Sequence, residues 1–462
     1  MAVGRDIQYP TSYILDPVAG YRLAKGLGSV RRKVNGILPA LMVLLLAASA
    51  AGQQKWRYSQ VYQPRNPTSQ FYTALPGLDL LVNDEFRLLR GKTVAVVTNH
   101  TGRDRKGRHI LDLLTAEGID VKVAFGPEHG LTGRIERGER IDEEVETAAG
   151  IRIYSLYGSS QKPTPDQFAG IDVLLFDIQD VGARYYTFVS TLTLVMDACA
   201  RDRIPILVLD RPTPVRGDFI EGPLVQPDYS SFMGLHPVPI RHGMTIGELA
   251  IMINEEGWLS ERRHANLTVV PVLNWSRYDW WEDTQLEWVP PSPNIPTPET
   301  ALAYLGTCLF EGTNVSEGRG TMTPFLLIGA PWIEQKSLAA KLNRWQLPGV
   351  SFADTTFIPV SIVGMAEKPK YMGETVGAVR LVITDKARFQ PVHTVAVMIH
   401  TIRESYPHHF EWISPHIDLL WGSDSFRRYI DNGRNIEAHP QTYGAERDAF
   451  YQRRKPYLIY HD

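Results

Sequence analysis

The sequence has only two cysteines among its 462 residues, Cys199 and Cys308. Each lies in an apolar stretch that reads as a helix, VMDACA and YLGTCLF, so we expect two buried free thiols. Two such cysteines supply neither a disulfide framework nor a cysteine-based zinc site. Stability therefore depends on a hydrophobic core, for which 44% of the residues are available, and the length suffices for two domains at about 150 residues each.

The sequence also lacks an excess of charge. Its 48 basic and 51 acidic residues leave a net charge of −3, so no global field attracts nucleic acid or acidic membranes. No G-x-G-x-x-G follows the first predicted strand, and Walker A and HEXXH sequences are absent, which argues against dinucleotide, P-loop and zincin sites. We expect no cofactor and no metal.

The apolar run ILPALMVLLLAASA at 37–50 has 14 residues, fewer than the ~20 of a transmembrane helix. It follows the basic stretch RRK and ends in the small-residue sequence ASA, the pattern of a secretory signal peptide. We therefore expect residues 1–50 to be a signal peptide and residues 51–75 a mobile lead-in. The mature protein should be periplasmic or extracellular, with no stable membrane span.

From residue 91 onward, apolar runs alternate with amphipathic segments. The predicted strands are KTVAVVTNH, VKVAFG, GIRIYS, IDVLLFD and IPILVLD, with helices such as HILDLLTAEG between them. Nearly continuous Val/Ile/Leu runs indicate a parallel sheet covered on both faces. An aromatic and proline-rich junction follows, then helices and the strands TFIPVSIV and AVRLVITD. The sequence predicts an α/β fold, with a Rossmann-like parallel sheet domain at 76–275 and a smaller α+β C-terminal domain at 276–462.

Each predicted strand of the first domain ends in a polar signature. These signatures are TNHTG with Asn99, GPEHG with Glu128, DIQD with Asp177 and Asp180, and DRPTP. Because parallel strands end at the same edge, we expect all four signatures on one rim of the sheet, where open α/β folds bind ligands.

Glu128 and His129 stand side by side in the second signature. A carboxylate at a strand end can act as a general acid if its surroundings raise its pKa toward neutrality. Both residue types also bind metals, although two adjacent ligands without spaced partners are a weak metal signal. The residues alone leave acid–base chemistry, metal binding and a structural turn open.

The stretch DIQDVGARYYTF places Arg184 and Tyr186 after the acids Asp177 and Asp180. An arginine here can bind a substrate carboxylate through two parallel hydrogen bonds, or hold the loop in an ion pair. DRPTP contains a second acid next to an arginine, Asp210-Arg211. We expect this second Asp–Arg set to have a structural role.

The junction and the loop after it are dense in hydrogen-bonding groups and glycines, as a polyhydroxylated ligand requires. Their candidates are Asn294 in PPSPNIPT and Glu311, Asn314, Glu317 and Arg319 in FEGTNVSEGRGT. A helix C-cap followed by a turn is the alternative interpretation.

Together these stretches resemble the exo-β-N-acetylmuramidases of peptidoglycan recycling, glycoside hydrolase family 171, formerly a domain of unknown function. The collinear matches are PEHG, SLYG, FDIQDVGARYYT, LDRPTP, HGMTIGELA, PPSPNIPT, FEGTNVSEGRGT and PFLLIGAPW, continuing to a C-terminal ID-L-G with R-Y-I. They extend from about Leu78 to the C-terminus. Two positions depart from the family pattern, Gly126 where alanine is expected and Thr213 where asparagine is expected, which leaves substrate detail open more than reaction class.

The resemblance implies a Rossmann-like catalytic domain and a smaller C-terminal domain with the active-site cleft between them. It implies release of N-acetylmuramic acid from non-reducing ends of peptidoglycan fragments, with Glu128 matching the catalytic glutamate. The second catalytic group is Asp177, Asp180, Glu311, Glu317 or the substrate's own 2-acetamido group. Arg184 or Arg319 would bind the lactyl carboxylate. The candidate substrate-binding residues are Asn99, His129, Asp180, Arg184, Tyr186, Asn294, Asn314 and Arg319.

Two other functions use the same cleft. A non-catalytic peptidoglycan-binding protein would hold glycan without cutting it, but such a protein has no need of the acid at position 128. A metal-dependent cell-wall amidase would act on the same material and would lose activity on treatment with a chelator.

Overall fold

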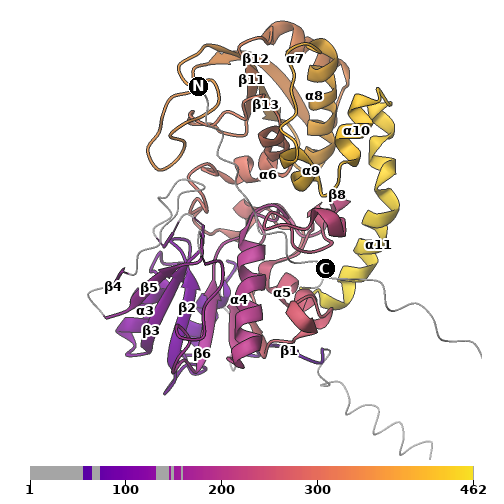
Figure 1. Cartoon of the computed structure of the whole chain (residues 1–462). Coiled ribbons are helices and arrows are strands. Elements are labelled where there is room, and N and C mark those ends of the chain that lie inside the picture. The colour runs from indigo at the N-terminus through magenta and orange to yellow at the C-terminus, as the bar shows by residue number, and fades with distance from the viewer. Residues whose placement is uncertain are drawn as a thin grey trace, which may run out of the picture. The chain divides into compact units, whose positions relative to one another are not determined.

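The structure is a computed structural model that describes residues 56–64, 73–128, 130–131, 145–146, 150–157 and 160–460. The expected signal peptide at 1–50 and His129 lie outside the described residues. Residues 58–460 fall within one compact unit, in which two sheets mark the two parts of the fold (Figure 1).

An eight-stranded sheet forms the first domain, in the order β1-β10-β7-β6-β2-β3-β5-β4. The strands are β1 (Ser59–Val61), β2 (Thr93–Thr98), β3 (Asp120–Gly126), β4 (Val145–Glu146), β5 (Arg152–Ser155), β6 (Val173–Asp177), β7 (Ile206–Leu209) and β10 (Leu267–Val270). All neighbours pair in parallel except β4 with β5. The predicted parallel sheet is confirmed, and β1, from the segment assigned to a mobile lead-in, is its edge strand.

Helices cover both faces of this sheet, as the continuous apolar strands require. They are α2 (Gly77–Asn83), α3 (Ile110–Ala116), α4 (Phe188–Asp202) and α5 (Ile246–Glu255). Alternate strand residues such as Val94, Val96 and Leu175 join one core cluster with α2 and α3. Helices α4 and α5 pack against each other in front of the sheet (Figure 1). Helix α5 begins with a capping box between Thr245 and Glu248, which satisfies its first N–H groups.

The order of the strands places a topological switch between β2 and β6. From β2 the chain runs outward through β3 to β5, then returns to β6 on the other side of β2 and continues to β7 and β10. In open α/β sheets, the crevice at the carboxyl ends of two such strands is the usual ligand position.

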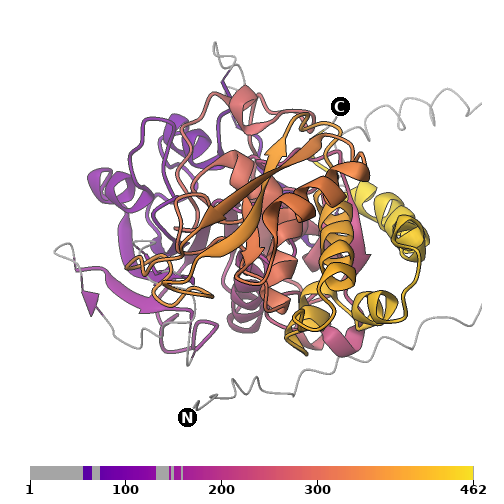
Figure 2. The same ribbon diagram turned by 90° about the horizontal axis from the view of Figure 1, so that it is seen from above.

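The second domain has a three-stranded antiparallel sheet in the order β11-β13-β12. Its strands are β11 (Leu327–Ala330), β12 (Val350–Phe357) and β13 (Val376–Ile383), and its helices are α6 (Pro298–Thr307), α7 (Gln335–Arg344), α8 (Pro391–Ser405), α9 (His416–Trp421), α10 (Ser425–Asp431) and α11 (Gly444–Arg454). Figure 2 shows this sheet from above, with α6 and α8 close to it. The predicted α+β organisation is confirmed.

Shorter elements connect these layers. A two-stranded sheet pairs β8 (Glu221–Leu224) with β9 (Pro239–Arg241). Short 3-10 helices occupy Pro227–Tyr229, Ser260–Arg262, Trp281–Thr284, Cys308–Gly312, Ile436–Thr442 and Lys455–Tyr457. The strand predicted for TFIPVSIV was misplaced, because β12 ends at Phe357 and Pro359, which has no backbone N–H, cannot continue the ladder.

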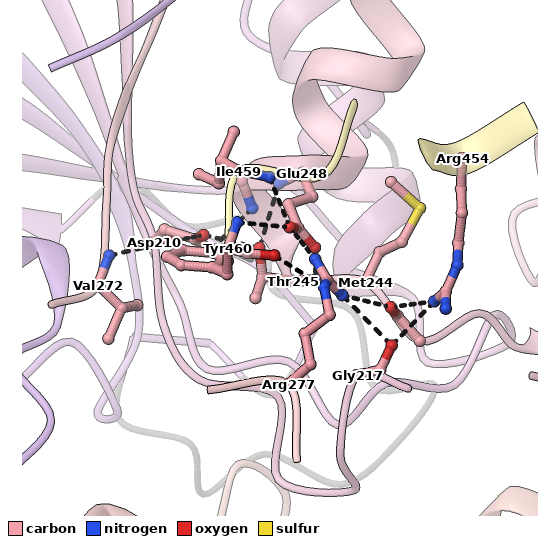
Figure 3. A network of polar contacts seen from close by, with 12 residues as sticks. Asp210, Gly217, Met244, Thr245, Glu248, Val272, Arg277, Arg454, Ile459 and Tyr460 are labelled. Atoms are coloured by element: carbon pink, nitrogen blue, oxygen red, sulfur yellow. Dashed lines mark hydrogen bonds and ion pairs between the residues drawn. The ribbon is translucent and has the colours of Figure 1, made fainter. Parts of the chain in front are cut away.

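The C-terminus returns to the first domain after α11 (Figures 1 and 3). The hydroxyl of Tyr460 donates to Oδ2 of Asp210 at 2.5 Å and accepts from the backbone N–H of Val272 at 2.9 Å. Beside it, the buried Glu248 pairs with Arg277 and accepts from the N–H of Ile459 at 2.9 Å. A buried polar network thus joins the last residues to the end of β7 and the start of α5.

Candidate active site

The four polar signatures lie on one rim, as predicted, because β7, β6, β2 and β3 are consecutive parallel neighbours. Hydrogen bonds connect the loops that follow three of them. The Thr101 hydroxyl donates to Asn99 Oδ1 at 2.6 Å and accepts from Gln179 N–H at 3.0 Å. Gln179 Nε2 donates to the Pro212 carbonyl at 2.8 Å. Asn99 is buried and orients Thr101, while Thr101 and Gln179 make the contacts between the loops.

A cavity opens beside the rim, between the end of β3, the start of α4 and the second domain. The described residues lining it come from both domains and are Glu128, Tyr185, Tyr186, Thr187, Phe188, Ser292, Asn294, Ile295, Tyr304, Cys308, Arg319, Phe325 and Leu420. Four of the predicted site residues, Glu128, Tyr186, Asn294 and Arg319, are therefore brought together from segments up to 191 positions apart (319 − 128).

Glu128 is the one carboxylate among the described lining residues. It follows β3 and is 7% exposed. Thr187, the residue that precedes α4, donates its hydroxyl to Oε2 of Glu128 at 2.6 Å. This bond fixes the carboxyl group and leaves Oε1 as the oxygen available to a ligand. The positive end of the α4 dipole lies next to it.

Arg319 is the one cationic side chain among the described lining residues. Its Nη2 lies 2.7 Å from Oε1 of Glu311 and its Nε lies 3.3 Å from Oε1 of Glu317. Its guanidinium group also lies over the ring of Phe325, 5.0 Å from the centroid. Lys370 holds the other oxygen of Glu317 at 3.0 Å. The two predicted carboxylates in this loop thus form ion pairs that orient Arg319.

Asn294 and Tyr186 bring neutral polar groups to the cavity. Asn294 donates through Nδ2 to the carbonyl of Met365 at 2.6 Å, while its buried Oδ1 has no donor among the described residues. Burial raises the pKa of Tyr186 well above its ordinary value, so the phenol stays protonated at neutral pH. The cavity therefore presents one amide acceptor and one phenolic O–H group.

Asp177 lies elsewhere on the rim, fully buried at the end of β6. Arg211 holds it with two hydrogen bonds, Nε to Oδ1 at 2.6 Å and Nη2 to Oδ2 at 3.0 Å. Asp210, the neighbour of Arg211 in sequence, instead accepts from Thr245 and Gly247 at the start of α5. The structural ion pair expected within Asp210-Arg211 is therefore between Arg211 and Asp177.

Asp180 is buried in the loop after β6, outside the described lining of the cavity. Its Oδ2 accepts from Gly182 N–H at 2.7 Å, and its Oδ1 has no hydrogen-bond partner among the described residues. Burial raises the pKa of Asp180 to about 7, against the opposing effect of the backbone N–H groups of Gly182 and Val181.

The side chains of two predicted binding residues, Arg184 and Asn314, form hydrogen bonds within the protein. The buried Arg184 donates to the carbonyls of Pro223 at 2.7 Å, Val238 at 3.1 Å and Leu420 at 2.7 Å. Asn314 bonds the carbonyl of His409 and the N–H of Glu411. Arg184 therefore ties β8 to α9 and is not placed to bind a substrate carboxylate. Asn314 anchors its own loop.

Several lining residues were not predicted as site residues, chiefly Thr187, Tyr304 and Phe325. Thr187 had a readable signal, since it lies in RYYT directly before a predicted helix, where a hydroxyl meets an N-terminus. Tyr304 and Phe325 pack edge to face, with ring centroids 4.8 Å apart. Nothing in their sequence context separates them from ordinary core residues.

The described residues show three further properties. Cys199 and Cys308 are both buried and neither forms a disulfide, which confirms the expectation from their apolar context. No cluster of three or more histidine, cysteine, aspartate or glutamate side chains in the described ranges forms a candidate metal site. None of the helices in those ranges is both long and apolar enough to cross a membrane.

Comparisons with known proteins match both domains. Residues 94–299 match a family model described as the N-terminal domain of the exo-β-N-acetylmuramidase NamZ, and residues 302–460 match its C-terminal domain. A curated relative, the peptidoglycan β-N-acetylmuramidase NamZ of Bacillus subtilis (strain 168), is 40% identical over 436 residues, which cover 93% of this chain and 100% of the relative.

Two solved structures of DUF1343 family proteins from Bacteroides fragilis NCTC 9343 are also similar. One is 31% identical with a TM-score of 0.77 and covers 85% of this chain and 100% of its own. The other is 33% identical with a TM-score of 0.68 and covers 84% of this chain and 99% of its own.

Proposed function

Because this chain belongs to the NamZ exo-β-N-acetylmuramidase family, we propose that Glu128 is the general acid with which it hydrolyses its glycosidic bond. The protein is an exo-acting glycoside hydrolase that releases N-acetylmuramic acid from non-reducing ends of peptidoglycan fragments. The observation that supports the assignment of the acid is the position of Glu128 in the cavity, with one carboxyl oxygen held by Thr187 and the other left for the substrate.

Proton donation from Oε1 of Glu128 to the glycosidic oxygen turns the leaving sugar into a neutral alcohol. Thr187 keeps the carboxyl group from rotating, because its hydroxyl is bonded to Oε2. A positioned acid of this kind contributes roughly 10²–10⁴-fold to the rate.

The second catalytic group is the substrate's own acetamido oxygen. Of the candidate carboxylates, Asp177 is paired with Arg211, and Glu311 and Glu317 are paired with Arg319. The fourth, Asp180, lies outside the described lining of the cavity. The acetamido oxygen attacks C1 as the C1–O bond breaks and Glu128 gives up its proton. The Glu128 carboxylate then takes a proton from water, which attacks C1 and opens the oxazolinium ring. Two displacements at C1 retain the β configuration, as in substrate-assisted glycosidases.

Asn294 and Tyr186 position the acetamido group for this attack. The Asn294 Oδ1 acceptor has its orientation fixed by the bond from Nδ2 to Met365. A buried acceptor without a donor is costly, and an acetamido N–H satisfies it. The phenolic O–H of Tyr186 donates to a sugar oxygen.

Arg319 binds the lactyl carboxylate that distinguishes muramic acid from glucosamine. Its ion pairs with Glu311 and Glu317 hold the guanidinium in place before substrate arrives, and preorganisation of this kind reduces the entropic cost of binding. A planar guanidinium suits a carboxylate ligand.

Export is part of the same proposal. A basic stretch, a 14-residue apolar run and a small-residue cleavage site precede the described chain. An exported enzyme would meet cell-wall fragments directly. Expression of the full sequence with a C-terminal tag, followed by N-terminal sequencing of the secreted protein, should identify a start near Ala51. A tagged protein that stays inside the cell with its first 50 residues intact would contradict export.

The experiment that tests the reaction uses the disaccharide and tetrasaccharide of alternating N-acetylmuramic acid and N-acetylglucosamine, with muramic acid at the non-reducing end. Mass spectrometry should detect one free N-acetylmuramic acid per cleavage, and early NMR spectra should show the β anomer. Peptide release from muramyl peptides without sugar cleavage would identify an amidase instead, and initial formation of the α anomer would exclude the acetamido mechanism.

A further inference from the structure

A second cavity lies at the topological switch point of the sheet. The proposed reaction uses none of the residues that line it. This cavity is lined by Thr101 and Arg103 from the loop after β2, Gln179 from the loop after β6, and Arg211 from the loop after β7. The catalytic cavity lies instead over β3 and α4. The position at which open α/β sheets most often bind a ligand is thus occupied by a separate cavity.

Three arginines, Arg103, Arg105 and Arg211, and two acids, Asp104 and the exposed Glu287, line this second cavity, so cationic side chains outnumber carboxylates there. Arg103 donates Nε to the His100 carbonyl at 2.9 Å and Nη1 to the Gly107 carbonyl at 2.6 Å. Both acceptors are neutral, and none of the ion pairs found among the described residues involves Arg103. The acid Asp104 on the same wall is neutralised by Arg108 at 2.6 Å. An oriented guanidinium without a carboxylate partner is a binding site for an anion.

Trp281 adds a second donor to the same wall. Its side chain is 6% exposed and packs edge to face on Trp288, with ring centroids 5.0 Å apart. The buried Nε1–H of Trp281 has no acceptor among the described residues. Buried donors are nearly always satisfied, so this N–H indicates an acceptor that the described residues do not provide.

One segment of the junction lines both cavities. Leu286 and Val289 contact the second cavity, while Ser292 and Asn294 contact the catalytic one. Between them the carbonyl of Pro290 is bonded to Nε2 of His100 at 2.7 Å. Six residues of extended chain span at most about 20 Å, so the walls of the two cavities that this segment forms lie within that distance of each other.

We propose that the switch-point cavity is a subsite for the carboxylate of the second muramyl residue, two sugars toward the reducing end from the bond that is cut. This inference rests on the proposed function, since it requires a glycan that alternates acidic and neutral sugars. Arg103 and the indole N–H of Trp281 bind the carboxylate oxygens. The enzyme therefore acts faster on a tetrasaccharide than on a disaccharide.

Binding and turnover test the subsite separately. For binding, calorimetry with Glu128→Gln compares the tetrasaccharide with the same molecule in which the second muramyl carboxyl is a primary amide. The amide should bind about tenfold more weakly, as expected for the loss of one charge-assisted hydrogen bond. Equal affinities would overturn the subsite, whatever the outcome of the catalytic test.

For turnover, the ratio of kcat/KM on the tetrasaccharide to that on the disaccharide should fall about tenfold in Arg103→Gln. Arg90→Gln is the matched control, because it removes the same charge from an exposed arginine that pairs with Glu85. An unchanged ratio in Arg103→Gln would contradict the subsite. Failure of the wild type to cut the disaccharide would instead contradict the proposed function.

Discussion

The hydroxyl of Thr187 donates a 2.6 Å hydrogen bond to Oε2 of Glu128 and thereby joins the start of α4 to the loop after β3. The two residues are 59 positions apart in the sequence. The bond determines which oxygen of the carboxyl group faces the substrate, so Thr187 is a positioning residue for the proposed acid.

Thr187→Val should lower kcat on the disaccharide by about 10–100-fold, the range expected for one hydrogen bond to a charged group. KM should change little, because Thr187 acts through Glu128. Thr187→Ser restores the donor and should recover most of kcat. Equal losses in the valine and serine variants would show that the hydroxyl is not what matters.

Arg319→Gln should weaken activity on β-N-acetylmuramides more than on the matching β-N-acetylglucosaminides, by about 10–100-fold in the ratio of kcat/KM. The reason is that only the muramides carry the lactyl carboxylate. Lys370→Gln is the control, since it removes the other cation bonded to Glu317 and does not line the cavity. Equal fold-losses of kcat/KM on both substrates would show that Arg319 does not recognise the lactyl carboxylate.

Asp177→Asn should affect stability rather than the chemical step. The change leaves Arg211, which is 7% exposed, without its charged partner, and breaking a buried pair costs about 3–5 kcal/mol. Urea unfolding should show this loss, while Glu85→Gln, which breaks an exposed pair, should cost at most about 1 kcal/mol. A fully stable Asp177→Asn variant with strongly reduced kcat would show that Asp177 takes part in the chemical step.

Tyr460→Phe should destabilise the protein, and more at pH 8 than at pH 4. Burial raises the pKa of Asp210 to about 6, and the Tyr460 hydroxyl opposes that rise. Because folded Asp210 binds its proton more tightly than the unfolded chain does, its contribution to stability is complete below about pH 4 and is lost as pH rises through about 6. Without the hydroxyl this loss extends to higher pH.

Urea unfolding at the two pH values measures the effect, with an expected cost of about 2–3 kcal/mol at pH 8. Tyr457→Phe is the matched control, since that hydroxyl bonds the partly exposed Glu256 at 3.1 Å. A cost that is the same at both pH values would mean that the Tyr460 hydroxyl does not stabilise the ionised form of Asp210.

The sequence predicted the parallel sheet well because its strands are buried on both faces and read as continuous apolar runs. It did not predict β1, whose three residues SQV carry no such pattern. It placed a strand at TFIPVSIV because β-branched residues dominate there, while the real β12 has the mixed sequence VSFADTTF and half-exposed positions. Pairing with β13 outweighs local propensity in that case.

The sequence could be used to pick out candidate site residues. It could not be used to predict which of their side chains contact each other. The sequence shows that Asp210 and Arg211 are adjacent, yet adjacent side chains of an extended chain point in opposite directions. Arg211 therefore reaches Asp177 of the neighbouring strand, and Asp210 faces α5. The same limit explains Arg184, whose carbonyl partners lie in β8, just before β9 and in α9, 39 to 236 positions away in the sequence.

The most direct test of the central claim compares Glu128→Gln with wild type on two substrates, the natural disaccharide and a 4-nitrophenyl β-N-acetylmuramide. Nitrophenolate leaves without protonation, whereas a sugar alkoxide does not. The variant should lose about 10²–10⁴-fold on the disaccharide and clearly less on the nitrophenyl glycoside. Equal losses on both substrates, or a disaccharide rate within a few-fold of wild type, would contradict the assignment of Glu128 as the acid.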